Sequence, residues 1–136
     1  MNILIIDDEK VISDFFMKLA QVDGNNQVDT ATSSEEALTQ VLRKDYNLIT
    51  LDIQMPGSSG LEVVAMLRNI NPRAVIAIIT GFLPEEISVE VETCVDVIIP
   101  KPVETLLFNQ LLKDAGLICQ AMDQIRHLGR SPRSYR

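Results

Sequence analysis

Carboxylate, hydroxyl and ammonium side chains stand at the ends of four of the five apolar stretches of this chain. The first stretch ends at Asp7 and Asp8, the third at Asp52, the fourth at Thr80 and the fifth at Lys101. Three carboxylates gathered in one place repel one another unless a cation lies among them. Ligands that are all oxygen suit Mg²⁺ or Mn²⁺ rather than zinc. A metal-held carboxylate with a lysine and a threonine beside it is equipped for phosphoryl transfer, with Asp52 as the attacking group.

These side chains converge only if the stretches that carry them form one parallel sheet. We expect strands at residues 2–6, 27–31, 47–51, 74–79 and 95–99, and helices at about 11–20, 33–42, 59–69, 84–93 and 103–127. The strands are short apolar runs bounded by turn residues, whereas apolar residues in the helices recur every three or four positions. Strict alternation of the two element types predicts a doubly wound (βα)5 α/β fold with a five-stranded parallel sheet. The carboxyl ends of parallel strands open on one side, where ligands bind.

The fourth helix is the least certain element of this pattern. Ile87, Val89 and Val91 alternate with polar residues, which is the period of a strand rather than of a helix. Two parallel neighbouring strands require a crossover connection, which is usually helical. We therefore expect a helix there, short and weakly held.

The last helix has an apolar pattern that outlasts the rest of the domain. Its apolar positions 111, 115, 118, 122 and 125 are spaced by four, three, four and three residues, which is a heptad seam. Gly116 inside the helix costs only about 1 kcal/mol. We expect one helix as far as about His127, divided into a domain at residues 1–116 and a helical extension at 117–130, with a disordered basic tail at 131–136. The extension should pack on the domain or on a second copy in a homodimer; alternatively it begins a linker to a missing output domain.

Four short motifs in order resemble the CheY-like receiver domain of two-component response regulators, over about residues 2–115. They are Ile6-Asp7-Asp8, Asp52-x-x-Met55-Pro56 with Gly60 eight residues after the aspartate, Thr80-Gly81 and Lys101-Pro102. The resemblance implies a flavodoxin-like sheet with strand order 2-1-3-4-5. It also implies that Asp52 accepts a phosphoryl group from a phosphohistidine of a sensor histidine kinase or phosphotransfer protein, and that a downstream protein or an output domain receives the signal.

The resemblance further assigns a role to each residue around Asp52. Asp8 would bind Mg²⁺ directly, Asp7 largely through water, and the backbone carbonyl of Gln54 would complete the protein ligands. Thr80 and Lys101 would contact the phosphoryl oxygens, and the Lys101–Pro102 peptide would be cis. The family usually carries Tyr or Phe three residues before the lysine as a switch residue that moves with the threonine. Here that residue is Ile98, which puts the aromatic switch in doubt.

Three other roles for these residues fit the sequence less well. Taken singly, Asp52 is an ordinary helix cap; the whole set favours a phosphoacceptor that catalyses its own reactions and is not a turnover enzyme. A haloacid-dehalogenase-like phosphatase needs a second acid where this chain has Gln54. A degenerate receiver that only binds a partner usually lacks the acidic pair or the lysine.

Composition narrows the remaining classes. The net charge of −7 argues against direct nucleic-acid binding by this domain. The apolar runs are too short for membrane spans. Cys94 and Cys119 show neither ligand spacing nor a disulfide framework. With a first strand almost at Met1, which leaves no room for a signal peptide, we expect a cytoplasmic protein.

Overall fold

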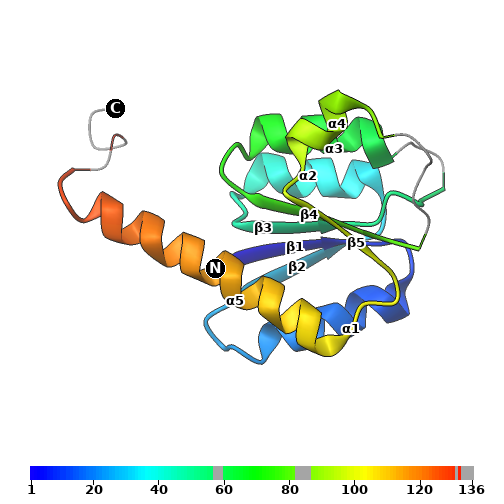
Figure 1. The fold of residues 1–136 in the computed structure, drawn as a ribbon, viewed down its shortest axis with the longest axis horizontal. Helices are drawn as coiled ribbons and strands as arrows, with labels where there is room; N and C mark the ends of the chain where they lie inside the picture. Colours follow the sequence, from blue (N-terminus) through cyan, green and yellow to red (C-terminus); the bar gives the residue numbers. More distant parts are fainter. Residues whose placement is uncertain (57–59, 82–86, 131, 133–136) are drawn as a thin grey trace.

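A parallel sheet of five strands lies between two layers of helices (Figure 1). The computed structural model describes residues 1–56, 60–81, 87–130 and 132. Strands and helices alternate along the chain as β1 (Asn2–Ile6), α1 (Lys10–Gln21), β2 (Gln27–Ala31), α2 (Ser34–Arg43), β3 (Leu48–Leu51), α3 (Gly60–Ile70), β4 (Val75–Thr80), α4 (Val89–Cys94), β5 (Val97–Pro100) and α5 (Thr105–Arg126). The predicted (βα)5 architecture is confirmed.

The strands lie in the order β2-β1-β3-β4-β5, and all four neighbouring pairs are parallel. The predicted order 2-1-3-4-5 is therefore correct. Strand order reverses beside β1, because the chain first adds β2 on one side and then β3 on the other. The carboxyl ends of β1 and β3 flank this switch point, which is where open α/β sheets bind ligands.

The three central strands β1, β3 and β4 are buried on both faces, which explains why they are almost continuously apolar, whereas the edge strand β2 is mostly half-buried and carries polar residues. Helices α2, α3 and α4 cover one face, and α1 and α5 cover the other (Figure 1). Successive residues of β1 point to opposite faces: Leu4 packs under α2 and α3, whereas Ile3 and Ile5 pack with Phe16 of α1 and Phe108 of α5. The two phenylalanine rings stack with their centroids 4.6 Å apart.

Local sequence features define helix α2 more clearly than helix α4. The Ser33 side chain caps α2 by accepting a hydrogen bond from the Glu36 N–H at 3.1 Å. Helix α4 has six residues, none of them buried, and Ser88 caps its start. The expected start of this helix near Pro84 lies outside the described residues. A helix does form despite the alternating pattern, and its brevity agrees with the expectation that it is weakly held.

Helix α5 is one uninterrupted helix of 22 residues with Gly116 inside it, and His127 is its C-cap. This confirms the predicted end of the helix. No helix among the described residues combines the length and the apolar character that crossing a membrane requires.

Candidate phosphoryl-transfer and metal site

The register of the sheet places the polar strand ends side by side. Ile6 at the end of β1 pairs with Leu51 at the end of β3, so the residues that follow them, Asp7 and Asp52, are neighbours. On the other side of β3 lie β4 and β5. Thr80 at the end of β4 pairs with Pro100 at the end of β5, and Lys101 follows directly. The Lys101 N–H also donates a hydrogen bond to the Thr80 carbonyl at 2.8 Å. Elements far apart in the sequence therefore deliver four functional side chains to one point.

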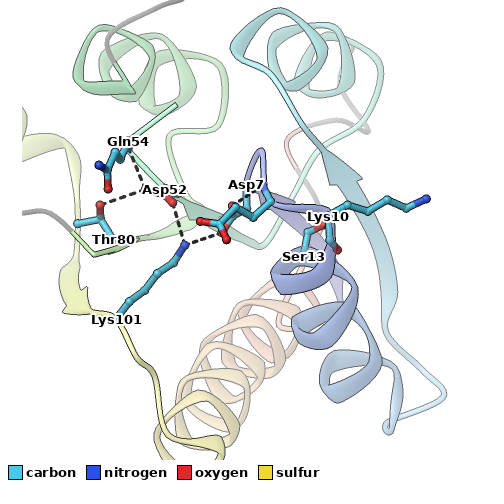
Figure 2. Close-up of polar contacts among 8 residues, drawn as sticks. Asp7, Lys10, Ser13, Asp52, Gln54, Thr80 and Lys101 are labelled. Carbon is cyan, nitrogen blue, oxygen red and sulfur yellow. Dashed lines mark hydrogen bonds and ion pairs between the residues drawn. The ribbon is translucent and has the colours of Figure 1, made fainter. Parts of the chain in front are cut away.

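The carboxylate of Asp52 is held from three sides (Figure 2). Its Oδ1 accepts hydrogen bonds from the Gln54 N–H at 2.8 Å and from the Thr80 hydroxyl at 3.0 Å. Its Oδ2 lies 2.8 Å from Nζ of Lys101. Asp52 is 4% exposed and Thr80 fully buried. A buried carboxylate requires such hydrogen-bond partners, and this network holds the Asp52 carboxylate in a fixed orientation.

Lys101 bridges two buried carboxylates. Its Nζ lies 2.8 Å from Oδ2 of Asp7 as well as from Oδ2 of Asp52. Burial alone would lower the pKa of Lys101, but hydrogen bonds and charge attraction from Asp52 and Asp7 outweigh it and raise that pKa above its ordinary value. The lysine is therefore fully charged at neutral pH and is the cation that the described residues provide inside the acidic cluster.

Three carboxylates at this edge of the sheet form a possible metal site. Oxygens of Asp7, Asp8 and Asp52 all lie within 4.8 Å of one another. Two opposite ligands of Mg²⁺ are about 4.2 Å apart, because each lies about 2.1 Å from the ion. The spacing and the all-oxygen chemistry thus fit a hard divalent cation after a small contraction. Beside the acids an open hollow of about 500 Å³ is lined by Asp8, Glu9, Ile53, Gln54, Met55 and Pro56.

Gly60 keeps helix α3 close to the site. A Cβ atom at this position would lie 2.5 Å from Cα of Ile53, the residue directly after Asp52. Real Cβ atoms do not approach backbone that closely, so any larger residue would push the start of α3 away from the strand end.

The structure also locates the residues of the expected switch. Ile98 on β5 is half-buried and packs against the core under α2 and α3, near Val91 and Cys94 of α4. The peptide bond between Lys101 and Pro102 is cis.

Two backbone N–H groups that bond the site aspartates were not predicted from the residue types. The Glu9 N–H donates to Oδ1 of Asp7 at 2.9 Å, in the same way as the Gln54 N–H donates to Asp52. Each bond runs from an aspartate to the amide two residues later, which is the geometry of an Asx turn. An aspartate at a strand end followed by a turn is the sequence signal that would have predicted both bonds.

Comparisons with known proteins agree on one family. The sequence profile described as "Response regulator receiver domain" matches residues 3–113. The transcriptional regulatory protein MalR of Bacillus subtilis is 33% identical over 119 residues, which cover 84% of this chain and 49% of that protein. The chain spans less than half the length of the curated relatives it matches, from 23% to 49%.

Solved structures give the same result in three dimensions. The response regulator TrrA from Thermotoga maritima, in complex with Mg²⁺ and BeF, has a TM-score of 0.71 and 30% identity, covering 84% of this chain and 97% of that one. A response regulator from Burkholderia pseudomallei with a phosphorylated aspartic acid, a calcium ion and citrate has a TM-score of 0.73 and 25% identity, covering 92% and 74%.

Proposed function

This chain belongs to the family of response regulator receiver domains of two-component systems, and on that premise we propose that it accepts a phosphoryl group on Asp52. The observation that carries the proposal is the buried Asp52 carboxylate, held by Thr80 and Lys101 beside two more acids. The phosphorylated aspartic acid in the Burkholderia pseudomallei relative supports it. The donor would be a phosphohistidine of a sensor histidine kinase or of a phosphotransfer protein. Such partners place the protein in the cytoplasm.

The acidic cluster would hold the metal ion that this chemistry uses. Asp7, Asp8 and Asp52 offer carboxylate oxygens, and Gln54, whose backbone carbonyl would complete the protein ligands, lines the same hollow as Asp8. Bound there, Mg²⁺ or Mn²⁺ would offset negative charge on the transferred phosphoryl oxygens. The Mg²⁺ in the TrrA complex and the calcium ion in the Burkholderia structure support a divalent cation.

The residues of this chain then orient the nucleophile and receive the charge. The carboxylate of Asp52 forms an oxygen–phosphorus bond while the phosphorus–nitrogen bond of the phosphohistidine breaks. The imidazole leaves with the electron pair of that bond and regains neutrality with a proton from solvent. The ammonium of Lys101 and the hydroxyl of Thr80, which now hold Asp52, would turn to the new phosphoryl oxygens.

Phosphorylation would change the surface that a downstream protein, or an output domain in a longer chain, recognises. A phosphoryl group brings about −1.5 to −2 charges to the site. Thr80 and Lys101 would contact the charged phosphoryl oxygens. Thr80 ends β4 and Lys101 directly follows β5, and helix α4 connects these two strands in the chain. In place of the usual aromatic residue, Ile98 offers no hydroxyl and less area, so the response would rely on Thr80 and on α4.

Two other functions give different results in the same experiment. A phosphatase of the haloacid-dehalogenase class needs a general acid two residues after the nucleophile, and the amide of Gln54 cannot supply a proton. A degenerate receiver would bind its partner without being phosphorylated. We therefore expect stoichiometric labelling and no turnover of phosphate esters.

Intact-mass spectrometry after incubation with acetyl phosphate and Mg²⁺ tests the proposal. The wild-type chain should gain one phosphoryl group, and Asp52→Asn should gain none. Asp29→Asn is a matched control, because Asp29 also contacts a lysine and a hydroxyl, Lys44 at 3.0 Å and Tyr46 at 2.6 Å, but belongs to no acidic cluster. Labelling should survive in the control. Equal labelling of wild type and Asp52→Asn, with no other acid of the site modified, would refute the assignment.

A further inference from the structure

The outer half of α5 presents an apolar face that its own domain leaves partly uncovered. Ala115, where the helix still lies on the sheet, is 2% exposed. Beyond it Ile118 is 52% and Ile125 58% exposed, and Met122 between them is half-buried. We call residues 117–126 the outer segment; it runs away from the body past the edge of the sheet where β1 begins (Figure 1).

The exposed apolar face leaves the outer segment with little packing to stabilise it as a helix. A helix of about ten residues is marginal in water, and most helices in proteins are stabilised by packing of their apolar face. The exposed Ile118 and Ile125 and the half-buried Met122 between them are spaced by four and three residues, which makes a narrow stripe. A stripe with this period fits one partner helix, because two helices in contact repeat every 3.5 residues.

Charge favours a second copy of this chain as that partner. The whole chain carries a net charge of −7, so most surfaces of two copies repel each other. The outer segment contains one acid and one base, Asp123 and Arg126, which form an ion pair with each other at 3.1 Å. Two outer segments therefore meet without repulsion. A lipid surface is a poor alternative, because it requires a strongly basic polar face, which this segment lacks.

The body of the domain determines the orientation. The stripe continues the face of α5 that packs on the sheet through Leu111 and Ala115. A partner helix running parallel along this stripe would meet the first copy's own sheet with its amino-terminal half. If the partner helix is antiparallel instead, the body of the second copy lies at the opposite end of the helix pair from the body of the first copy. The bodies then limit the overlap to the two outer segments, which brings Ile118 opposite Ile125 of the second copy and Met122 close to the two-fold axis.

We propose that the chain forms an antiparallel homodimer through the 118/122/125 stripe of α5. The contact is small beside the roughly 1,200 Å² that a stable interface buries, so association is weak and depends on concentration. This inference goes beyond phosphoryl acceptance and does not depend on it. Asp52→Asn should therefore dimerise like the wild type, whereas failure of labelling would leave the dimer unaffected.

Sedimentation equilibrium over a concentration series tests the interface with a matched pair of variants. Ile118→Glu and Leu117→Glu introduce the same charge into neighbouring helix positions that are 52% and 53% exposed. Leu117 lies off the stripe and lines a different hollow, which Val22 at the end of α1 also lines. Ile118→Glu should weaken dimerisation at least tenfold and Leu117→Glu less than twofold. Far-UV circular dichroism and urea unfolding of each variant verify that the body stays folded.

Disulfide trapping tests the orientation in a background with Cys94→Ser and Cys119→Ser. Met122→Cys should cross-link to itself. Ile118→Cys and Ile125→Cys should each cross-link poorly alone but efficiently when the two variants are mixed. Efficient self-linking of both single variants would mean a parallel pair and overturn the orientation. A wild type that stays monomeric at about 1 mM, or equal effects of the two glutamate variants, would overturn the dimer itself.

Discussion

Replacing Lys101 by methionine tests whether this one cation keeps the acidic cluster folded. Its Nζ lies 2.8 Å from one oxygen of Asp7 and one of Asp52, whose side chains are 4% and 5% exposed. Methionine keeps most of the length and the apolar stem of lysine but leaves two buried carboxylates without their shared cation. In the absence of metal we therefore expect a large loss of stability.

The size of the loss follows from two estimates that agree. The carboxylate oxygens lie within 4.8 Å of each other, and two charges at this distance repel by about 3–4 kcal/mol at an effective dielectric constant of 20. Protonating one carboxyl relieves the repulsion, and from an ordinary aspartate pKa of about 3.9 this costs about 4 kcal/mol at pH 7 and about 1.5 kcal/mol at pH 5. The free energy of unfolding should thus fall by about 3–4 kcal/mol at pH 7, but by only about 1.5 kcal/mol at pH 5.

Urea unfolding with EDTA at the two pH values measures this loss, and Lys44→Met is the matched control. Lys44 also pairs with an aspartate, Asp29, at 3.0 Å, but there the two side chains are 35% and 33% exposed. Its removal should cost less than about 1 kcal/mol at either pH. Millimolar Mg²⁺, or a second change Asp52→Asn, should restore most of the loss in Lys101→Met and none in the control. A loss below about 1 kcal/mol at pH 7, or one that does not shrink at pH 5, contradicts this reasoning.

Three further changes probe the supports of the site and of the fold. Gly60→Ala should lower the free energy of unfolding by about 1–3 kcal/mol and slow labelling by acetyl phosphate, because its Cβ would stand 2.5 Å from Cα of Ile53. Arg68→Ala should lower the free energy of unfolding in urea by about 2–3 kcal/mol and speed amide exchange in α4 more than in α3, because the Arg68 guanidinium donates hydrogen bonds to the carbonyl of Cys94 at the end of α4 and to that of Ala74 just before β4. Burial and a hydrogen bond to Asp29 raise the pKa of Tyr46, so its contribution to stability is complete below about pH 10 and is lost at higher pH. Tyr46→Phe should therefore unfold more easily at pH 7 and lose less stability than the wild type between pH 9 and pH 11.

The fold could be predicted from the sequence because its three central strands, β1, β3 and β4, are buried on both faces. Continuous apolar runs such as Leu48–Leu51 mark such strands without ambiguity, and the crossover rule supplies the helices between them. Helix α4 was the exception. Its residues alternate with the period of a strand, and only the half-buried Val91 and Cys94 pack on the core, so the core-facing side is too small to decide its pattern. Tertiary connectivity, rather than local sequence, makes it a helix.

The side chains of the site could be predicted, but their pairing could not. Residue types at strand ends indicated the acids, the threonine and the lysine, since parallel strands open on one side. That Lys101 contacts Asp7 and Asp52 equally depends on the register of three strand pairs, which residue types do not encode. The exposure of Ile118 and Ile125, by contrast, follows from the heptad pattern, because the seam continues past the point where the domain should end.

If Asp52 accepts a phosphoryl group as proposed, the contacts that hold its carboxylate in the unphosphorylated state would transmit the change to the backbone. Lys101 and Thr80 both bond the Asp52 carboxylate, and the Lys101 N–H is bonded to the Thr80 carbonyl. A doubly charged group further from the backbone would draw both side chains outward, and this backbone bond would make the ends of β4 and β5 move together. Helix α4 lies between β4 and β5 in the chain and contacts the core only through the half-buried side chains of Val91 and Cys94, so it offers little resistance. The movement is therefore expected to appear at α4, with Ile98 following through its contacts in the core.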